Sequence, residues 1–134
     1  MNEGPFQRTR RDHKSENAED YVELISDLID SNGQARVGAL AERLGVSQVT
    51  VSKTLKRLDK EGYVVAKPYR PVVLTPKGKL IAESARIRHK TVVQFLLALG
   101  VPLETAETDA EGIEHHVSPA TLEAMSRHVR NGSD

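Results

Sequence analysis

The acidic segment DAEGIEHHVS, residues 109–118, holds the side chains with the most distinctive chemistry in this chain. Glu111, Glu114 and His115 are spaced i, i+3 and i+4, so a helix would project all three from one face. Two carboxylates held beside an imidazole are costly unless a cation is bound among them. The spacing therefore predicts a divalent metal site, and the alternative is an acidic surface helix with a spare histidine.

Further hard ligands lie on two other predicted helices. Asp20 and Glu23 are spaced i, i+3 near the start of one of them, where acids also complement the helix dipole. His89 lies in the middle of a long apolar helix, where a lone histidine is more often simply packed. If the three helices converge, four carboxylates and two imidazoles meet, enough to balance two divalent cations: Asp20, Glu23, His89, Glu111, Glu114 and His115.

The ligand types restrict the choice of metal. Oxygen-rich ligation with two imidazoles and no sulfur favours Mn²⁺ or Fe²⁺ over copper or structural zinc, although Zn²⁺ and Co²⁺ also bind such sites. The chain has no cysteine, which excludes disulfides, thiolate metal sites and cysteine catalysis. The neighbouring acids Glu104, Glu107 and Asp109 are interpreted as solvated surface charges.

The segment VGALAERLGVSQVTVSKTLKRL, residues 37–58, predicts a helix-turn-helix. Gly45 supplies the turn, and Ser47 can cap the second helix. The apolar positions expected to be buried where the two helices cross are Leu40, Leu44, Val46, Val51 and Leu55.

The second of these helices has a polar start and a basic continuation, typical of a DNA-reading helix. Two β-prone runs, 63–66 and 72–74, follow as a hairpin wing. Residues 36–90 contain 13 lysines and arginines against 4 acids in a chain of zero net charge, which favours an anionic partner. The predicted DNA contacts are Gln48, Thr50, Ser52, Lys53, Lys56, Arg57, Lys67 and Arg70; the alternative is a solvated helical hairpin with basic decoration.

The remaining pattern is helical. Apolar residues recur at helical spacing from Asp20 to Asn32, and a long apolar helix runs from Pro76 to about Leu99. Two more helices are expected over about 102–116 and 119–130, the second capped by Ser118. Residues 1–18 lack a hydrophobic period and are expected to form a flexible tail. The fold class is mainly α with a small β-hairpin.

The composition and hydropathy of the chain exclude several classes of protein. No apolar stretch is long enough to span a membrane, and the N-terminus lacks a secretory h-region, so we expect a cytoplasmic protein without a membrane partner. With two Phe, three Tyr and no Trp, single-strand binding by stacking is disfavoured.

Four segments together resemble the diphtheria-toxin-repressor-type metalloregulators, and within them the manganese branch: EDYVELISDLI, YVVAKPYRPVVLTPKGKLIAES, RHKTVVQFLLALGV and DAEGIEHHVS. The resemblance covers about Glu19 to Arg130 and implies a homodimeric, metal-activated repressor of manganese-uptake genes. The family's manganese ligands fall on the same six residues. Iron-type relatives carry Met and Cys at the positions of Asp20 and Glu111, so the acids here favour manganese. Pro71 and Lys90 depart from the family pattern.

The resulting expectation is a winged helix-turn-helix domain (19–76) followed by an all-α dimerisation and metal-binding domain (77–134), after a tail (1–18). Mn²⁺, up to two ions per subunit, would control binding to double-stranded operator DNA, with no small organic substrate. Three alternatives remain at this point: an iron-responsive repressor of the same family, a metal-independent DNA-binding adaptor, and a dinuclear metallohydrolase.

Overall fold

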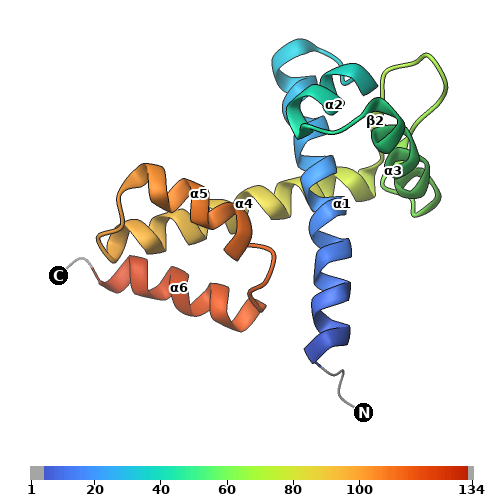
Figure 1. Ribbon diagram of the computed structural model, residues 1–134. Coiled ribbons are helices and arrows are strands. Elements are labelled where there is room, and N and C mark those ends of the chain that lie inside the picture. Colours follow the sequence, from blue (N-terminus) through green and yellow to red (C-terminus); the bar gives the residue numbers. More distant parts are fainter. Residues whose placement is uncertain (1–4, 133–134) are drawn as a thin grey trace. The chain divides into compact units, whose positions relative to one another are not determined.

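The computed structural model describes the backbone of residues 5–132 and the side chains of Phe6 and of residues 17–132. This part of the chain contains six helices and one two-stranded sheet (Figure 1). In chain order they are α1 (Pro5–Asn32), α2 (Val37–Leu44), α3 (Gln48–Lys60), β1 (Val64–Val65), β2 (Val73–Leu74), α4 (Pro76–Ala98), α5 (Leu103–Ile113) and α6 (Pro119–Asn131). The predicted fold class, mainly α with a hairpin, is confirmed.

The chain separates into two compact units. Residues 17–83 form one, called here the winged unit, and the second, called the helical unit, contains residues 84–132. The separation falls inside α4, some residues after the boundary expected at 76/77. None of the helices in the described region is both long and apolar enough to cross a bilayer.

The winged unit is built on one buried face of α1. Tyr21, Ile25 and Leu28 recur at helical spacing and are almost completely buried. They pack in one cluster with residues of α2 and α3, among them Leu40 and Leu55. Such a continuous apolar core fixes the orientation of α3, whose opposite face is left to solvent.

The turn between α2 and α3 follows the predicted chemistry. Gly45 adopts a left-handed conformation with φ of 69°, and Ser47 Oγ accepts a hydrogen bond from Thr50 N at 3.1 Å. Val51 is buried as expected, whereas Val46 is 40% exposed. The burial predicted for Val46 is therefore wrong. Val46 follows the left-handed residue Gly45, so it no longer continues the helical spacing of α2 that would place its side chain in the core.

The wing is a short antiparallel hairpin in which Val64 pairs with Leu74. It is attached to the unit at two places. Asp59 Oδ2 at the end of α3 accepts a hydrogen bond from Ala66 N at 2.9 Å. Val72 N donates to Ala35 O at 2.7 Å, forming an isolated bridge to the segment between α1 and α2.

The start of α4 is packed closely against the beginning of the wing. Thr75 caps the helix, since its hydroxyl accepts a hydrogen bond from Gly78 N at 3.1 Å and donates to Gly62 O at 2.6 Å. Gly78 is buried, and a Cβ at this position would overlap the carbonyl oxygen of Tyr63. Only glycine allows this approach of α4 to the chain before β1.

The helical unit is a three-helix arrangement of the C-terminal part of α4 with α5 and α6 (Figure 1). Small side chains, Ala106 and Ala110, let α5 approach Val92 and Val93 of α4. The rings of Phe95 and His128 meet edge to face with centroids 5.5 Å apart, so His128 packs α6 onto α4.

Two helix ends differ from expectation. The segment 1–18, expected to be a flexible tail, is helical from Pro5 onward, and residues 1–4 lie outside the described region. Extension of an already formed helix costs much less than nucleation, so α1 continues without an apolar stripe there. The helix expected over about 102–116 ends at Ile113, because the chain tightens into a turn after Gly112.

Candidate metal centre and nucleic-acid interface

A cluster of one histidine and two glutamates joins α4 to the end of α5. Donor atoms of His89, Glu111 and Glu114 all lie within 4.8 Å of one another. His89 Nδ1 is 2.9 Å from Glu114 Oε2 and 3.5 Å from Glu111 Oε1. Glu114 is 1% exposed and Glu111 is exposed, so the cluster extends from the protein interior to solvent.

Local structure explains how α5 presents these acids. Glu111 lies in the last turn of the helix and Glu114 is the residue that ends it. The small residues Ala106 and Ala110 hold the same helix close to α4, where His89 lies. The predicted i, i+3 relation of Glu111 and Glu114 thus brings both carboxylates to one imidazole.

A further glutamate reaches the same histidine from its other side. Glu107 Oε2 is 2.7 Å from His89 Nε2, although Glu107 had been interpreted as a solvated charge. Glu107 is exposed as expected, but the interpretation missed this contact. The sequence does carry a signal for the contact, because Glu107 precedes Glu111 by four residues and so lies one turn earlier on the same helical face.

The carboxylates change the acidity of the imidazole. Burial alone would lower the pKa of His89, but the hydrogen bond with Glu107 and the charges of Glu114 and Glu111 outweigh it. The pKa of His89 is therefore raised above its ordinary value.

The other predicted ligands are distributed as follows. His115 lies just after α5, its side chain is 1% exposed, and its Nε2 is 3.3 Å from Glu114 Oε1. It does not belong to the group of donor atoms within 4.8 Å. Asp20 and Glu23 are partly buried residues of α1 in the winged unit.

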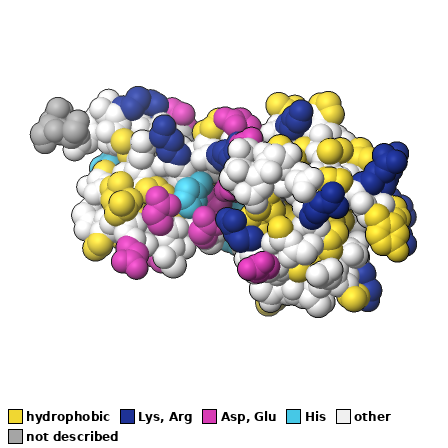
Figure 2. Space-filling model, turned by 90° about the horizontal axis from the view of Figure 1, so that it is seen from above, with side chains coloured by type: hydrophobic (Ala, Val, Ile, Leu, Met, Phe, Trp, Pro, Cys, Tyr) yellow, Lys and Arg dark blue, Asp and Glu magenta, His cyan; other side chains and the backbone are white. Residues whose placement is uncertain are grey.

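The residues present fit a hard divalent cation. Carboxylate oxygens and imidazole nitrogen are the donors that Mn²⁺ and Fe²⁺ accept, and no sulfur occurs in the cluster. Within the described residues, the buried Nδ1 of His89 has no hydrogen-bond partner despite the nearby carboxylate, so its lone pair is available to a metal. Acidic side chains are visible beside histidine on the helical unit (Figure 2).

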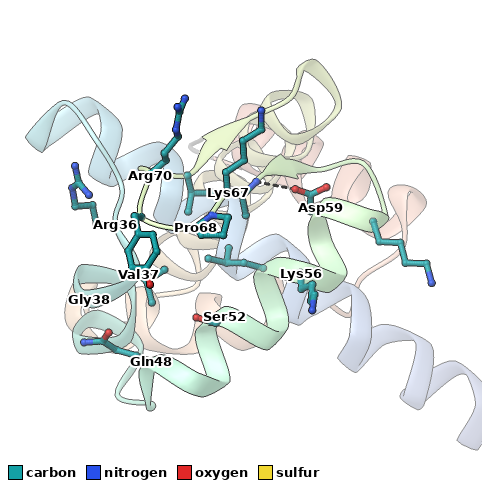
Figure 3. A pocket seen from close by; sticks show the side chains of 15 residues that line it. Arg36, Val37, Gly38, Gln48, Ser52, Lys56, Asp59, Lys67, Pro68 and Arg70 are labelled. Carbon is teal, nitrogen blue, oxygen red and sulfur yellow. Dashed lines mark hydrogen bonds between the residues drawn. The ribbon is translucent and has the colours of Figure 1, made fainter.

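A second candidate site is a groove of about 730 Å³ between the start of α2, the exposed face of α3 and the wing (Figure 3). Five of the predicted DNA contacts line it: Gln48, Ser52, Lys56, Lys67 and Arg70. Among the other lining residues, sequence reasoning missed Arg36, Lys60 and Tyr69 as candidate contacts. Tyr69 is fully exposed at the wing with φ of 63°, a left-handed conformation that is uncommon for a non-glycine residue.

The other three predicted DNA contacts lie outside the lining of this groove. Thr50 Oγ1 is 3.0 Å from Ser47 Oγ, so its hydroxyl belongs to the helix cap. Arg57 donates to Glu61 Oε1 at 3.0 Å and to Asn17 Oδ1 at 2.6 Å. Lys53 is exposed on α3. Basic side chains are also seen among hydrophobic ones on the visible face of the winged unit (Figure 2).

Because Lys53 is exposed and Arg57 is paired, substitutions of these two α3 residues should differ in their effect on the salt dependence of DNA binding. Lys53→Ala should lower the slope of log affinity for DNA against log salt by about 0.9, as for the loss of one phosphate contact. Arg57→Ala should change this slope less, because its guanidinium is already paired with Glu61. Fluorescence anisotropy with an operator duplex over a salt series measures both. Lys79→Ala, an exposed lysine of α4 outside the groove, is the charge-matched control. A wild-type slope in Lys53→Ala would contradict a phosphate contact.

A winged helix joined to a helical unit with a hard-ligand cluster is the architecture of a metal-binding transcriptional regulator, a DNA-binding class without enzymatic activity. Residues 13–72 match the family described as iron dependent repressor, N-terminal DNA binding domain, and residues 75–133 match its metal binding and dimerisation domain. The chain therefore belongs to the iron dependent repressor family.

Relatives agree with this assignment. The chain is 54% identical to the transcriptional regulator MntR of Salmonella typhimurium over 120 residues, 90% of this chain and 76% of that protein. It is 48% identical to the HTH-type transcriptional regulator MntR of Geobacillus thermodenitrificans over 100 residues, covering 75% and 71% of the two chains.

Solved structures show the same fold. A manganese-dependent transcriptional repressor in complex with manganese is similar with a TM-score of 0.76 and 30% identity, over 84% of this chain and 52% of that chain. The manganese regulator SloR gives a TM-score of 0.73 and 28% identity, over 84% and 53%. The chain thus spans about half the length of these two structures.

Proposed function

We propose that this protein is a manganese-responsive transcriptional repressor that binds operator DNA when Mn²⁺ is bound. The observation that carries the proposal is the cluster of His89, Glu111 and Glu114, a set of hard donors within 4.8 Å in a chain that also has a basic winged helix. The MntR relatives and the manganese-dependent repressor structure support it.

The proposed ligand set is the six residues predicted from sequence, which add Asp20, Glu23 and His115 to the cluster. When bound, Mn²⁺ would supply the positive charge that offsets repulsion among the carboxylates. His89 offers Nδ1, and Glu114 offers a carboxylate already desolvated. Four carboxylates match two divalent cations per subunit, and Fe²⁺, Co²⁺ and Zn²⁺ are proposed competitors for the same donors.

The proposed partners are double-stranded operator DNA and a second copy of the chain. Exposed leucines of the helical unit, Leu97, Leu99 and Leu103, offer apolar surface to a partner subunit. A metal held by ligands from both units of a subunit would restrict the movement of its winged unit. In a homodimer this would hold the two copies of α3 about 34 Å apart, the length of one DNA turn. We also propose that the protein acts in the cytoplasm. Its targets would be genes for manganese uptake.

Mn²⁺ is therefore expected to tighten operator binding, and a chelator should reverse the effect. Coupling is reciprocal, so operator DNA should tighten Mn²⁺ binding by the same factor, about 5–150-fold for a typical allosteric protein. Fluorescence anisotropy of a labelled operator duplex, followed by calorimetric titration of Mn²⁺ with and without that duplex, measures both factors. Equal operator affinity with Mn²⁺ and with chelator would contradict the proposal.

An iron-responsive repressor is the second candidate, favoured by membership of the iron dependent repressor family. The acids at positions 20 and 111 argue for manganese over the softer ligands of iron-type relatives. Titration of operator binding with Mn²⁺, Fe²⁺, Co²⁺ and Zn²⁺ in parallel distinguishes the two. A response to Fe²⁺ at lower free metal than to Mn²⁺ would favour the iron-responsive alternative.

A further inference from the structure

Glu107 and His89 form a contact that the six proposed ligands leave unexplained. Glu107 Oε2 lies 2.7 Å from His89 Nε2, a short distance for a nitrogen–oxygen hydrogen bond. Glu107 is about half exposed, while the His89 side chain is 19% exposed. The glutamate therefore approaches the imidazole from the solvent side.

The opposite edge of the ring faces the carboxylates of Glu111 and Glu114. His89 Nδ1 lies near Glu114 and Glu111, and among the described residues it has no hydrogen-bond partner. A neutral imidazole carries its proton on one nitrogen and a lone pair on the other. A cation held by Glu111 and Glu114 on this edge would take the Nδ1 lone pair, which leaves the proton of the ring on Nε2, where Glu107 lies 2.7 Å away.

Glu107 is set apart from the ligands by geometry. It is not among the residues whose donor atoms lie within 4.8 Å of one another, although Glu111 and Glu114 on the same helix are. It contacts the ring nitrogen that points away from them. A carboxylate in this place holds the imidazole without taking a place at the metal.

We propose that Glu107 is a positioning residue for the metal centre: by accepting the Nε2 proton of His89, it fixes the tautomer and ring orientation that present Nδ1 to the cation. The proposal rests on the manganese-binding function proposed above. Such carboxylate–histidine–metal arrangements raise the basicity of the imidazole, and loss of the outer carboxylate typically weakens metal binding by about 10–100-fold.

Three variants separate this role from a general charge effect. Glu107→Ala removes the acceptor, whereas Glu107→Gln removes the charge but keeps an oxygen that can accept the same proton. Asp109→Ala removes an exposed carboxylate two residues further along α5, and is the matched control. Calorimetric titration with Mn²⁺ alone gives the affinities.

We expect Glu107→Ala to lose about 10–100-fold in Mn²⁺ affinity, Glu107→Gln to recover most of that loss, and Asp109→Ala to match the wild type. Wild-type affinity in Glu107→Ala would overturn the proposal. Equal losses in the Ala and Gln variants would also overturn it, because Glu107 would then act through its charge.

Nitrogen NMR of the His89 ring with Zn²⁺, a diamagnetic competitor for the same donors, gives a readout other than Mn²⁺ affinity. The wild type should show the metal on Nδ1 and a proton on Nε2, and a metal on Nε2 would overturn the proposal. If the wild type showed this pattern with Zn²⁺ but its operator binding did not respond to Mn²⁺, the proposed function would fail while the role of Glu107 stood.

Discussion

Replacement of Glu114 by Gln is expected to make operator binding insensitive to Mn²⁺. Glu114 is the buried carboxylate of the cluster, and its Oε2 lies 2.9 Å from His89 Nδ1. The amide keeps the shape of the side chain but removes the negative charge that a hard cation requires. Since even outer residues contribute about 10–100-fold, loss of this carboxylate should weaken Mn²⁺ binding by roughly 100-fold or more.

Calorimetry with Mn²⁺ and anisotropy with the operator duplex measure the two effects of Glu114→Gln. The metal-free variant should remain folded, because Glu107 and Glu111 still lie beside His89, and a thermal melt checks this. Glu104→Gln changes an exposed acid at the first turn of α5 and serves as the control. Retention of a normal Mn²⁺ response in Glu114→Gln would remove Glu114 from the ligand set.

The substitution Gly78→Ala is expected to destabilise the winged unit by about 3 kcal/mol. A methyl group at this position would overlap the carbonyl oxygen of Tyr63, a backbone atom that cannot rotate away. The start of α4 would have to separate from the chain before β1, at the cost typical of overpacking. The Thr75 cap, which accepts a hydrogen bond from Gly78 N, would be disturbed as well.

Urea unfolding followed by circular dichroism measures the change in the free energy of unfolding. Gly112→Ala is the matched control, since it lies in α5 with no atom near its added methyl group, and alanine favours a helix by about 1 kcal/mol over glycine. Equal stability of Gly78→Ala and wild type would mean that the close approach of α4 is not required.

The helix-turn-helix was largely predictable because local signals and burial agree there. Glycine at the turn, a serine cap and apolar spacing all specify the same helix-turn-helix, and the structure confirms each of them. What sequence reasoning could not supply is which basic side chains are already engaged. Arg57 is engaged by Glu61, four residues later, and by Asn17, which is far away in sequence. Only tertiary packing brings Asn17 to Arg57.

The acidic cluster was predicted less completely. The spacing of Glu111 and Glu114 showed that they share a side of α5, and His89 was identified as a candidate by its type. The rotation of α5 about its axis relative to α4 depends on the packing of Ala106 and Ala110, which no local pattern specifies. That rotation decides whether Glu107 reaches the imidazole, so the sequence did not reveal this contact of an otherwise exposed side chain.

The bridge between Ala35 and Val72 gives the wing a mechanical property. A two-stranded hairpin alone is marginally stable in water and would flex freely about its base. Here a backbone hydrogen bond of 2.7 Å ties the wing to the segment that leaves α1, and Asp59 ties its other arm to α3. Each arm of the wing is thus held by one hydrogen bond, one arm to α3 and the other to the segment after α1, so movement of the wing relative to either requires that a hydrogen bond be broken.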